Sequence, residues 1–251
     1  MKIFLSGGDN GSGKKAIENL LSKGIKMKYN LMSYFYVRKA NFDIADKIRD
    51  NSELILIDSG AHSFQFGAKV DFLEYTKEYA EFIRKFDRPN VVGYFEMDIE
   101  NIIGYEKVLE LRKILEAVSD KIIPVWHPDR GIEDYEEMCK KYAGKVVAIG
   151  GFRGTDIKDE QFIMFLKVAR KYGCKVHCLG MTRKKVLDKV PFDFCDSSSW
   201  LQMAIRGKVG DRKVSRAFSK SNYITVVEES YKHAMKMQEH YYHRWQKVCK
   251  D

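Results

Sequence analysis

Short apolar runs alternate with longer amphipathic segments along nearly the whole chain. Each short run is almost continuously apolar, which is typical of strands buried on both faces of a parallel sheet. Each longer segment repeats its apolar positions at about the helical period. The pattern therefore predicts alternating strand and helix units. The expected strands are residues 2–6, 54–58, 91–97, 121–126, 146–149, 175–179 and 192–195, with an eighth between residues 208 and 217.

The strict alternation favours a closed (β/α)₈ barrel of the TIM type over an open doubly wound sheet. The length of 251 residues suits one such barrel. We expect residues 1–220 to form the barrel and residues 221–251 to form a C-terminal helix packed across one end of it. The expected helices are residues 14–22, 41–49, 72–86, 105–118, 132–142, 160–171 and 183–189, followed by a long one at 223–248.

Composition narrows the class of protein. A hydrophobic fraction of 45% with 13% aromatic residues supports a packed core and excludes a disordered chain. No apolar run reaches the roughly 18 residues of a membrane span, and the first ten residues do not resemble an export signal. The five cysteines are scattered, without a CxxC pair, which favours reduced thiols. We therefore expect a soluble, cytoplasmic protein.

Basic residues outnumber acidic ones by 44 to 35, and part of the excess is clustered. Residues 167–189 hold eight Lys and Arg against one Asp, and residues 206–220 hold six against one. Such stretches suit a phosphate backbone, although a solvated helix face would look the same. The residues expected to contact nucleic acid are Lys184, Lys185, Arg206, Arg212, Lys213 and Arg216.

Carboxylates follow three of the expected strands. Asp58, Asp98 and Asp196 stand at or near the C-terminal ends of these strands, where the catalytic groups of such barrels gather. Each one alone could cap the helix that follows it. Three acids crowded at one barrel mouth repel one another and lose hydration, so together they indicate catalysis.

Two other motifs fit their chemistry less well. Residues 8–15 match the glycine and lysine spacing of a phosphate-binding loop, but Lys15 stands where Ser or Thr would hold magnesium. His233, His240, His243 and Cys249 fall on the last predicted helix without the paired cysteines of a structural zinc site. We expect an ordinary βα turn at the first and a packing face at the second, with no metal and no cofactor.

Five short motifs occur in a fixed order between residues 50 and 200. Together they resemble those of the tRNA-guanine transglycosylase superfamily, whose barrels carry a DSGG[FY]Q motif, an acidic strand end, a GGL segment, an H-x-[LM]-G segment and a D-x-F-D motif. The similarity is greatest to the compact phage and bacterial members that insert 7-deazaguanines into DNA. The matching segments here are DSGAHS at 58–63, MDI at 97–99, IGGF at 149–152, HCLGM at 177–181 and DFCD at 193–196.

The resemblance implies a pentosyltransferase that exchanges bases through a covalent intermediate. Asp196 corresponds to the nucleophile that attacks the sugar C1′, and Asp193 is the alternative. Asp58 corresponds to the general acid and base that serves the departing and incoming purines. The residues that would hold the base are Ser59, Gly60, His62, Asp98, Trp126, His127, Gly150, Gly151, Phe152, Leu179 and Gly180.

Three departures refine this expectation. His62 stands where the family has an aromatic residue, and Trp126 and His127 stand where it commonly has a glutamine. The zinc domain with which the tRNA enzymes grip their substrate has no counterpart in this sequence. We therefore expect exchange of guanine for a 7-deazaguanine, such as 7-cyano-7-deazaguanine, in DNA, with a phage-encoded enzyme acting in the host cytoplasm. Open alternatives are a tRNA enzyme with a partner subunit, a non-catalytic nucleic-acid-binding barrel and a small-molecule lyase.

Overall fold

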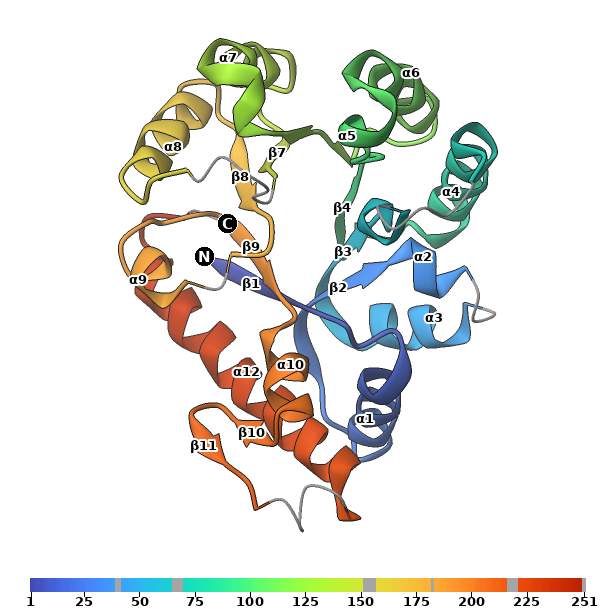
Figure 1. The fold of residues 1–251 in the computed structure, drawn as a ribbon, viewed down its shortest axis with the longest axis vertical. Coiled ribbons are helices and arrows are strands. Elements are labelled where there is room, and N and C mark those ends of the chain that lie inside the picture. The colour runs from blue at the N-terminus through green and yellow to red at the C-terminus, as the bar shows by residue number, and fades with distance from the viewer. Residues whose placement is uncertain (39–41, 65–69, 151–156, 182, 216–220, 250–251) are drawn as a thin grey trace.

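The computed structural model describes residues 1–38, 42–64, 70–150, 157–181, 183–215 and 221–249 (Figure 1). Its main sheet is a closed parallel barrel, which confirms the predicted fold class. The strand order is β5-β4-β3-β2-β1-β9-β8-β7-β6. The strands are β1 (Lys2–Ser6), β2 (Met27–Ser33), β3 (Ser52–Asp58), β4 (Val91–Phe95), β5 (Ile122–Ile123), β6 (Val125–Trp126), β7 (Val146–Ile149), β8 (Lys175–Cys178) and β9 (Phe194–Ser197).

Closure depends on residues 122–126, which act as one strand interrupted by Pro124. On one side, the carbonyl of Ile123 accepts a hydrogen bond from the backbone of Glu96, 3.1 Å away. On the other side, the carbonyl of Pro124 accepts one from Ala148, 2.9 Å away. Because Pro124 has no N–H, the ladder loses a donor there, yet both neighbours remain bonded. The two short strands β5 and β6 therefore fill the single position that completes an eight-stranded barrel.

Strand β2 replaces the expected eighth strand. The sequence MKYNLMS of β2 contains Lys28 and Asn30, which interrupt the apolar run that marks the other strands. Asn30 is buried, and its side chain bonds to those of Ser52 and Tyr231. The prediction of a barrel strand between residues 208 and 217 is wrong. In this segment β10 (Lys208–Val209) and β11 (Arg212–Lys213) pair only with each other, as a hairpin outside the barrel.

Helices surround the barrel at most of the predicted positions (Figure 1). Helix α4 shows why: its buried face repeats at helical spacing, and the Asp71 side chain caps its start by accepting bonds from two backbone N–H groups. The helices are α1 (Gly11–Ser22), α2 (Tyr34–Val37), α3 (Asp43–Asp50), α4 (Phe72–Phe86), α5 (Glu100–Ile103), α6 (Tyr105–Glu116), α7 (Gly131–Lys141), α8 (Gln161–Lys171), α9 (Lys184–Leu187), α10 (Ser199–Ile205) and α12 (Tyr223–Trp245), with 3₁₀ turns at Ala61–Phe64 and Pro128–Arg130.

Helix α12 lies along the outer wall of the barrel, beside α1 and α10, and not across one end as expected (Figure 1). Its Gln238 amide donates to the carbonyls of Ile3 and Tyr29 at 2.8 and 2.7 Å, which joins β1 to β2. Tyr231 and Tyr241 of the same helix are buried, but His240 and His243 are exposed, so the packing face expected for these histidines is wrong. No helix in the described ranges is both long and apolar enough to cross a membrane.

The barrel interior is packed with apolar side chains, so the barrel is a core and not a pore. Phe4 meets Phe194 edge-on, with ring centroids 5.8 Å apart. The buried apolar side chains of this interior are those of Phe4, Tyr29, Leu31, Leu56, Phe95, Ile123, Val125, Ala148 and Phe194.

A buried ion pair supports the closure at β4. Glu96 is 1% exposed, receives two guanidinium hydrogen bonds from Arg112 of α6, and also accepts a bond from the backbone N–H of Val125. Burial raises the pKa of Glu96, although Arg112 and the Val125 bond oppose the rise. Removing only the cation would therefore leave a buried acid without its main partner.

We predict that Arg112→Met lowers the free energy of unfolding by about 3–5 kcal/mol, measured by urea denaturation at neutral pH. Lys107→Met is the control, because it breaks the exposed pair of Lys107 with Glu110 on the same helix and should cost less than about 0.5 kcal/mol. Equal losses in the two variants would show that the buried pair has no special part in closure.

Candidate active site

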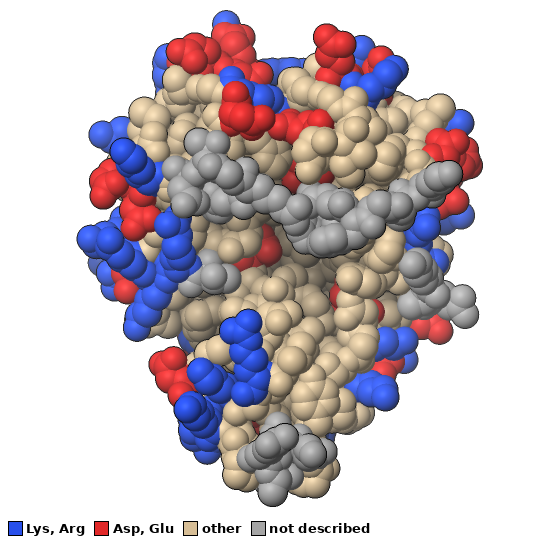
Figure 2. All heavy atoms as spheres, in the orientation of Figure 1, with Lys and Arg blue, Asp and Glu red and all other residues tan. Residues whose placement is uncertain are grey.

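The C-terminal ends of the barrel strands meet at one hollowed face, and acidic atoms lie in its depth (Figure 2). Asp58 ends β3, Asp98 follows β4 by three residues, and Asp196 lies within β9. All three are partly buried. The charges of Asp98 and Asp196 both act on Asp58, which places the three predicted acids in one electrostatic cluster. We call this end of the barrel the mouth.

Asp58 holds its proton unusually strongly. Its Oδ2 accepts a hydrogen bond from the backbone N–H of Gly60 at 2.9 Å. Burial raises the pKa of Asp58 to about 7; repulsion by the other mouth carboxylates adds to this, and the Gly60 bond opposes it. Near neutral pH the group can therefore both donate and accept a proton, as a general acid and base must.

A fourth carboxylate, Asp9, lies at the mouth and was not among the predicted site residues. It is 3% exposed, and its Oδ2 accepts a hydrogen bond from the backbone of Ser33 at 2.6 Å. Burial raises the pKa of Asp9 to about 6, and its charge also acts on Asp58. Asp9 follows β1 by three residues, as Asp98 follows β4. In the sequence, its segment points only to a possible phosphate-binding loop.

Asp98 is bonded to His127, with 2.6 Å between Oδ1 and Nε2. Burial alone would lower the pKa of His127, but the bond to Asp98 and the charges of Asp98 and Glu100 outweigh it, so the pKa is raised. The imidazole ring lies against Gly150, where an added Cβ would come within 2.4 Å of the ring. Glycine is thus required at this position for His127 to reach Asp98.

Two donors hold one oxygen of Asp196. The Nε2 of His177 and the backbone N–H of Gly180 both lie 2.9 Å from its Oδ1. Gly180 has a φ of +62°, which favours glycine and turns its N–H toward the carboxylate. Within the described part of the chain, Oδ2 of Asp196 accepts no hydrogen bond. The alternative nucleophile, Asp193, precedes β9 and bonds to the Val176 backbone near the opposite end of the barrel.

Several predicted base-binding residues do not present free groups to the mouth. Trp126 points outward, where it packs against Tyr135 and Phe165. Ser59 is fully buried, and its carbonyl accepts a bond from Tyr75. Of the two glycines whose backbone N–H groups were expected to bind the base carbonyl, Gly150 instead donates to the carbonyl of Trp126. The N–H of Leu179 donates to the carbonyl of Ile149. The side chain of His62 lies outside the described residues, as do Gly151 and Phe152.

The predicted nucleic-acid contacts are exposed on one side of the mouth. Lys184 and Lys185 lie on α9, Arg206 follows α10, and Arg212 and Lys213 form β11; all five are exposed. Figure 2 shows Lys and Arg atoms gathered at the left and lower left of the hollowed face, near α9 and the hairpin. Arg216 lies outside the described residues.

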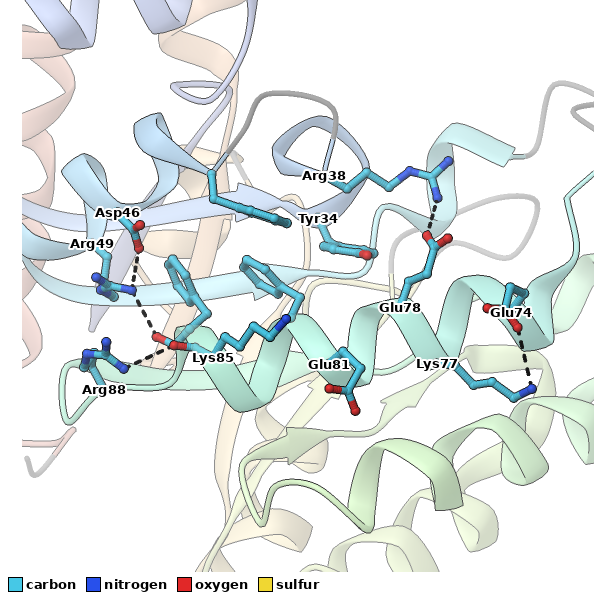
Figure 3. A pocket seen from close by; sticks show the side chains of 13 residues that line it. Tyr34, Arg38, Asp46, Arg49, Glu74, Lys77, Glu78, Glu81, Lys85 and Arg88 are labelled. Carbon is cyan, nitrogen blue, oxygen red and sulfur yellow. Dashed lines mark hydrogen bonds and ion pairs between the residues drawn. The ribbon is translucent and has the colours of Figure 1, made fainter.

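A groove of about 880 Å³ lies away from the mouth, between α4 and the segment of α2 and α3 (Figure 3). Phe82 and Phe86 form part of its apolar wall, with rings stacked 4.7 Å apart. Both basic and acidic residues line it, and Arg38 pairs with Glu78 at 3.0 Å. None of its lining residues belongs to the predicted site.

Comparisons with known proteins support the fold. No family model and no curated protein matches this sequence. The structure is similar to that of a protein assigned as a fructose-1,6-biphosphate aldolase from Coccidioides immitis, with a TM-score of 0.56 and 14% identity over 95% of this chain and 89% of that one. A mutant tryptophan synthase α-subunit from Pyrococcus furiosus gives a TM-score of 0.45 and 16% identity over 91% and 96% of the two chains. At such low identity the first likeness establishes a TIM barrel and nothing about activity.

The raised pKa of Asp58 gives the protein a defined dependence on pH. Between the ordinary value of 3.8 and about 7, only the folded state holds this proton. Asp58 therefore lowers stability as the pH rises through that window, by up to about 1.4 kcal/mol per pH unit.

We predict that Asp9→Asn lowers the pKa of Asp58, because it removes a like charge while leaving an oxygen for the Ser33 bond. Carboxyl-carbon NMR titration should show a decrease of up to about one unit. The control is Asp50→Asn, which removes an exposed carboxylate on α3. An Asp58 titration that does not move, or moves equally in the control, would place Asp9 outside the coupled cluster.

Proposed function

We propose that this protein is a base-exchange transglycosylase that replaces guanine in DNA by a 7-deazaguanine. The observation that supports the proposal is that two carboxylates at the same barrel mouth have different environments, one suited to proton transfer and the other to nucleophilic attack. Asp58 has a pKa of about 7 and can move a proton at neutral pH. Asp196 has one oxygen held by two donors and the other without a partner among the described residues. The motif resemblance assigns these same residues as acid–base and nucleophile.

In the first half-reaction, Oδ2 of Asp196 attacks C1′ of the target nucleotide. The glycosidic bond breaks, its electron pair leaves with guanine, and Asp58 supplies a proton to the departing base. In the second half-reaction, Asp58 takes a proton from the incoming 7-deazaguanine, whose nitrogen attacks C1′. The bond from C1′ to Asp196 then breaks, and the carboxylate is restored. Asp58 is therefore protonated again at the end of the cycle.

Asp98 is the candidate for reading the base. A carboxylate can accept hydrogen bonds from the amino and ring N–H groups that guanine and 7-deazaguanine share. Its bond to His127 occupies Oδ1 and fixes the orientation of the carboxylate. Trp126 packs against the surrounding helices, so we do not propose that it contacts the base.

The substrate backbone must lie beside the mouth while the reacting nucleotide enters it. A sugar carbon inside a duplex is out of reach, so the nucleotide is flipped out or presented single-stranded. The side chains expected to contact the neighbouring phosphates are exposed, although Lys185 also pairs with Asp159 at 3.6 Å. They are Lys184, Lys185, Arg206, Arg212 and Lys213. We propose DNA as the substrate, and the following assay distinguishes it from tRNA.

The test is incorporation of labelled guanine or 7-cyano-7-deazaguanine into purified DNA and, separately, into purified tRNA. We predict label in DNA and a loss of at least about a thousandfold in the folded Asp196→Asn variant. The matched control is Asp193→Asn, which changes an acid on the same chain segment at the opposite end of the barrel. Label in tRNA alone would reassign the substrate. Label in neither, with nucleic-acid binding retained, would favour a non-catalytic barrel.

A second prediction concerns the basic side of the mouth. Neutralising Lys184, Lys185, Arg206, Arg212 and Lys213 together should weaken DNA binding and flatten its salt dependence. On duplex DNA, the log–log slope against salt should change by about 0.9 for each phosphate that the variant no longer neutralises. Binding of the free base, measured by calorimetry, should be unchanged.

The control for this variant neutralises five exposed lysines of α4, α6 and α7. These residues are Lys77, Lys85, Lys107, Lys113 and Lys140. The control removes the same net charge, so it separates a local binding surface from a general effect of charge. Equal slopes in the two variants would contradict a DNA-binding surface at α9 and the hairpin.

A further inference from the structure

His177 stands in an environment that does not suit an imidazole. It lies on β8 facing the barrel interior and has an exposed fraction of 0%. Its ring meets that of Phe95 edge-on, with centroids 4.9 Å apart, and lies 6.3 Å from that of Phe4. An apolar side chain would fill this layer without burying polar atoms, so packing alone does not explain a histidine here.

The two ring nitrogens of His177 have different surroundings. Nε2 lies 2.9 Å from Oδ1 of Asp196. Nδ1 is buried and has no hydrogen-bond partner among the described residues. A carboxylate oxygen only accepts, so Nε2 must carry the proton that joins them. A second proton on Nδ1 would place an unpaired donor and a charge among aromatic rings, which favours the neutral ring with a bare Nδ1.

A neutral donor affects a nucleophile differently from a cation. It fixes the direction of the carboxylate without forming an ion pair that would withdraw charge from it. With the Gly180 N–H, it engages Oδ1 from two sides and leaves Oδ2 without a hydrogen-bond partner among the described residues. Since β8 and β9 are paired at His177 and Phe194, the sheet itself sets the distance between the ring and Asp196.

We infer that His177 is a positioning residue for Asp196: as a neutral imidazole it donates to Oδ1 and so makes Oδ2 the attacking oxygen. This inference rests on the proposed transglycosylase function. His177 itself does not contact the substrate, because it lies below the mouth in the closed core. Its effect should therefore fall on formation of the covalent intermediate and not on binding of the base.

The test compares His177→Phe and His177→Gln by the single-turnover rate of intermediate formation, the KM for the free base and the melting temperature. We expect the Phe variant to react about a hundredfold more slowly with its KM changed less than about twofold, because the nucleophile is misplaced but the base pocket remains. Its melting temperature should be unchanged or higher. The Gln variant should recover to within about tenfold of the original rate, since its amide can donate from a position similar to Nε2.

Phe95→Leu is the matched control, since it disturbs the same interior layer without removing the donor to Asp196. It should lower the melting temperature and leave the rate of intermediate formation nearly unchanged. A His177→Phe protein that forms the intermediate at the original rate would overturn the inference. Equal slowing in Phe, Gln and the Phe95→Leu control would do so as well, because it would show a purely structural role.

Nitrogen NMR of the His177 ring tests the tautomer without any assay of activity. We expect a protonated Nε2 and a bare Nδ1 at neutral pH. A doubly protonated ring, or a proton on Nδ1 alone, would overturn the inference. If the unmodified protein exchanges no base, the proposed function fails and the role of His177 in it fails too; if it exchanges bases and His177→Phe does so equally well, only this inference fails.

Discussion

The crowding of carboxylates at the barrel mouth is the constraint on which the rest of the site depends. Asp9, Asp58, Asp98 and Asp196 come from four different strand ends, and the charges of the other three act on Asp58. Buried like charges cannot all stay ionised without cost. Two features reduce this repulsion. The pKa values of Asp58 and Asp9 are raised, so these two groups hold their protons to higher pH. Asp98 is bonded to His127, and Asp196 is bonded to His177 and the backbone N–H of Gly180.

This arrangement requires a rigid support, because the donors work only at hydrogen-bond distance. The barrel supplies it through a complete ring of paired strands, including the interrupted strand at Pro124. Near this interruption Glu96 and Arg112 link β4 to α6 beneath the loop that carries Asp98. On the other side of the barrel, α12 joins β1 to β2 through Gln238. Closure of the barrel therefore fixes the distances between the functional groups, because these groups lie at the ends of its short strands.

Much of the fold could be predicted from the sequence, because most strands are continuous apolar runs. Strand β2 could not, since Lys28 and Asn30 interrupt its run and the partners that satisfy Asn30 are remote in sequence, on β3 and α12. The hairpin at 208–213 cannot be distinguished from a barrel strand in the sequence, because a single sequence does not show which strands pair. The buried Gln238 likewise gives no local signal of the strand carbonyls it joins.

The candidate site likewise contains residues that could be predicted from the sequence and residues that could not. Asp58, Asp98 and Asp196 could be found because carboxylates at strand ends converge in any parallel barrel. Trp126 and His127 cannot both face the mouth, since successive strand residues point to opposite faces, and the structure selects His127. Asp9 and the role of His177 depend on distances between strands, which appear only in three dimensions.

In the proposed mechanism, Asp196 forms a covalent bond with the sugar while Asp58 moves the proton. Mass spectrometry of the protein after a denaturing quench, with DNA present and free base removed, tests it most directly. We expect a nucleic-acid adduct on the peptide that contains Asp196, absent in Asp196→Asn and strongly reduced in Asp58→Asn. Base exchange without any adduct, or an adduct mapped to Asp58, would contradict it.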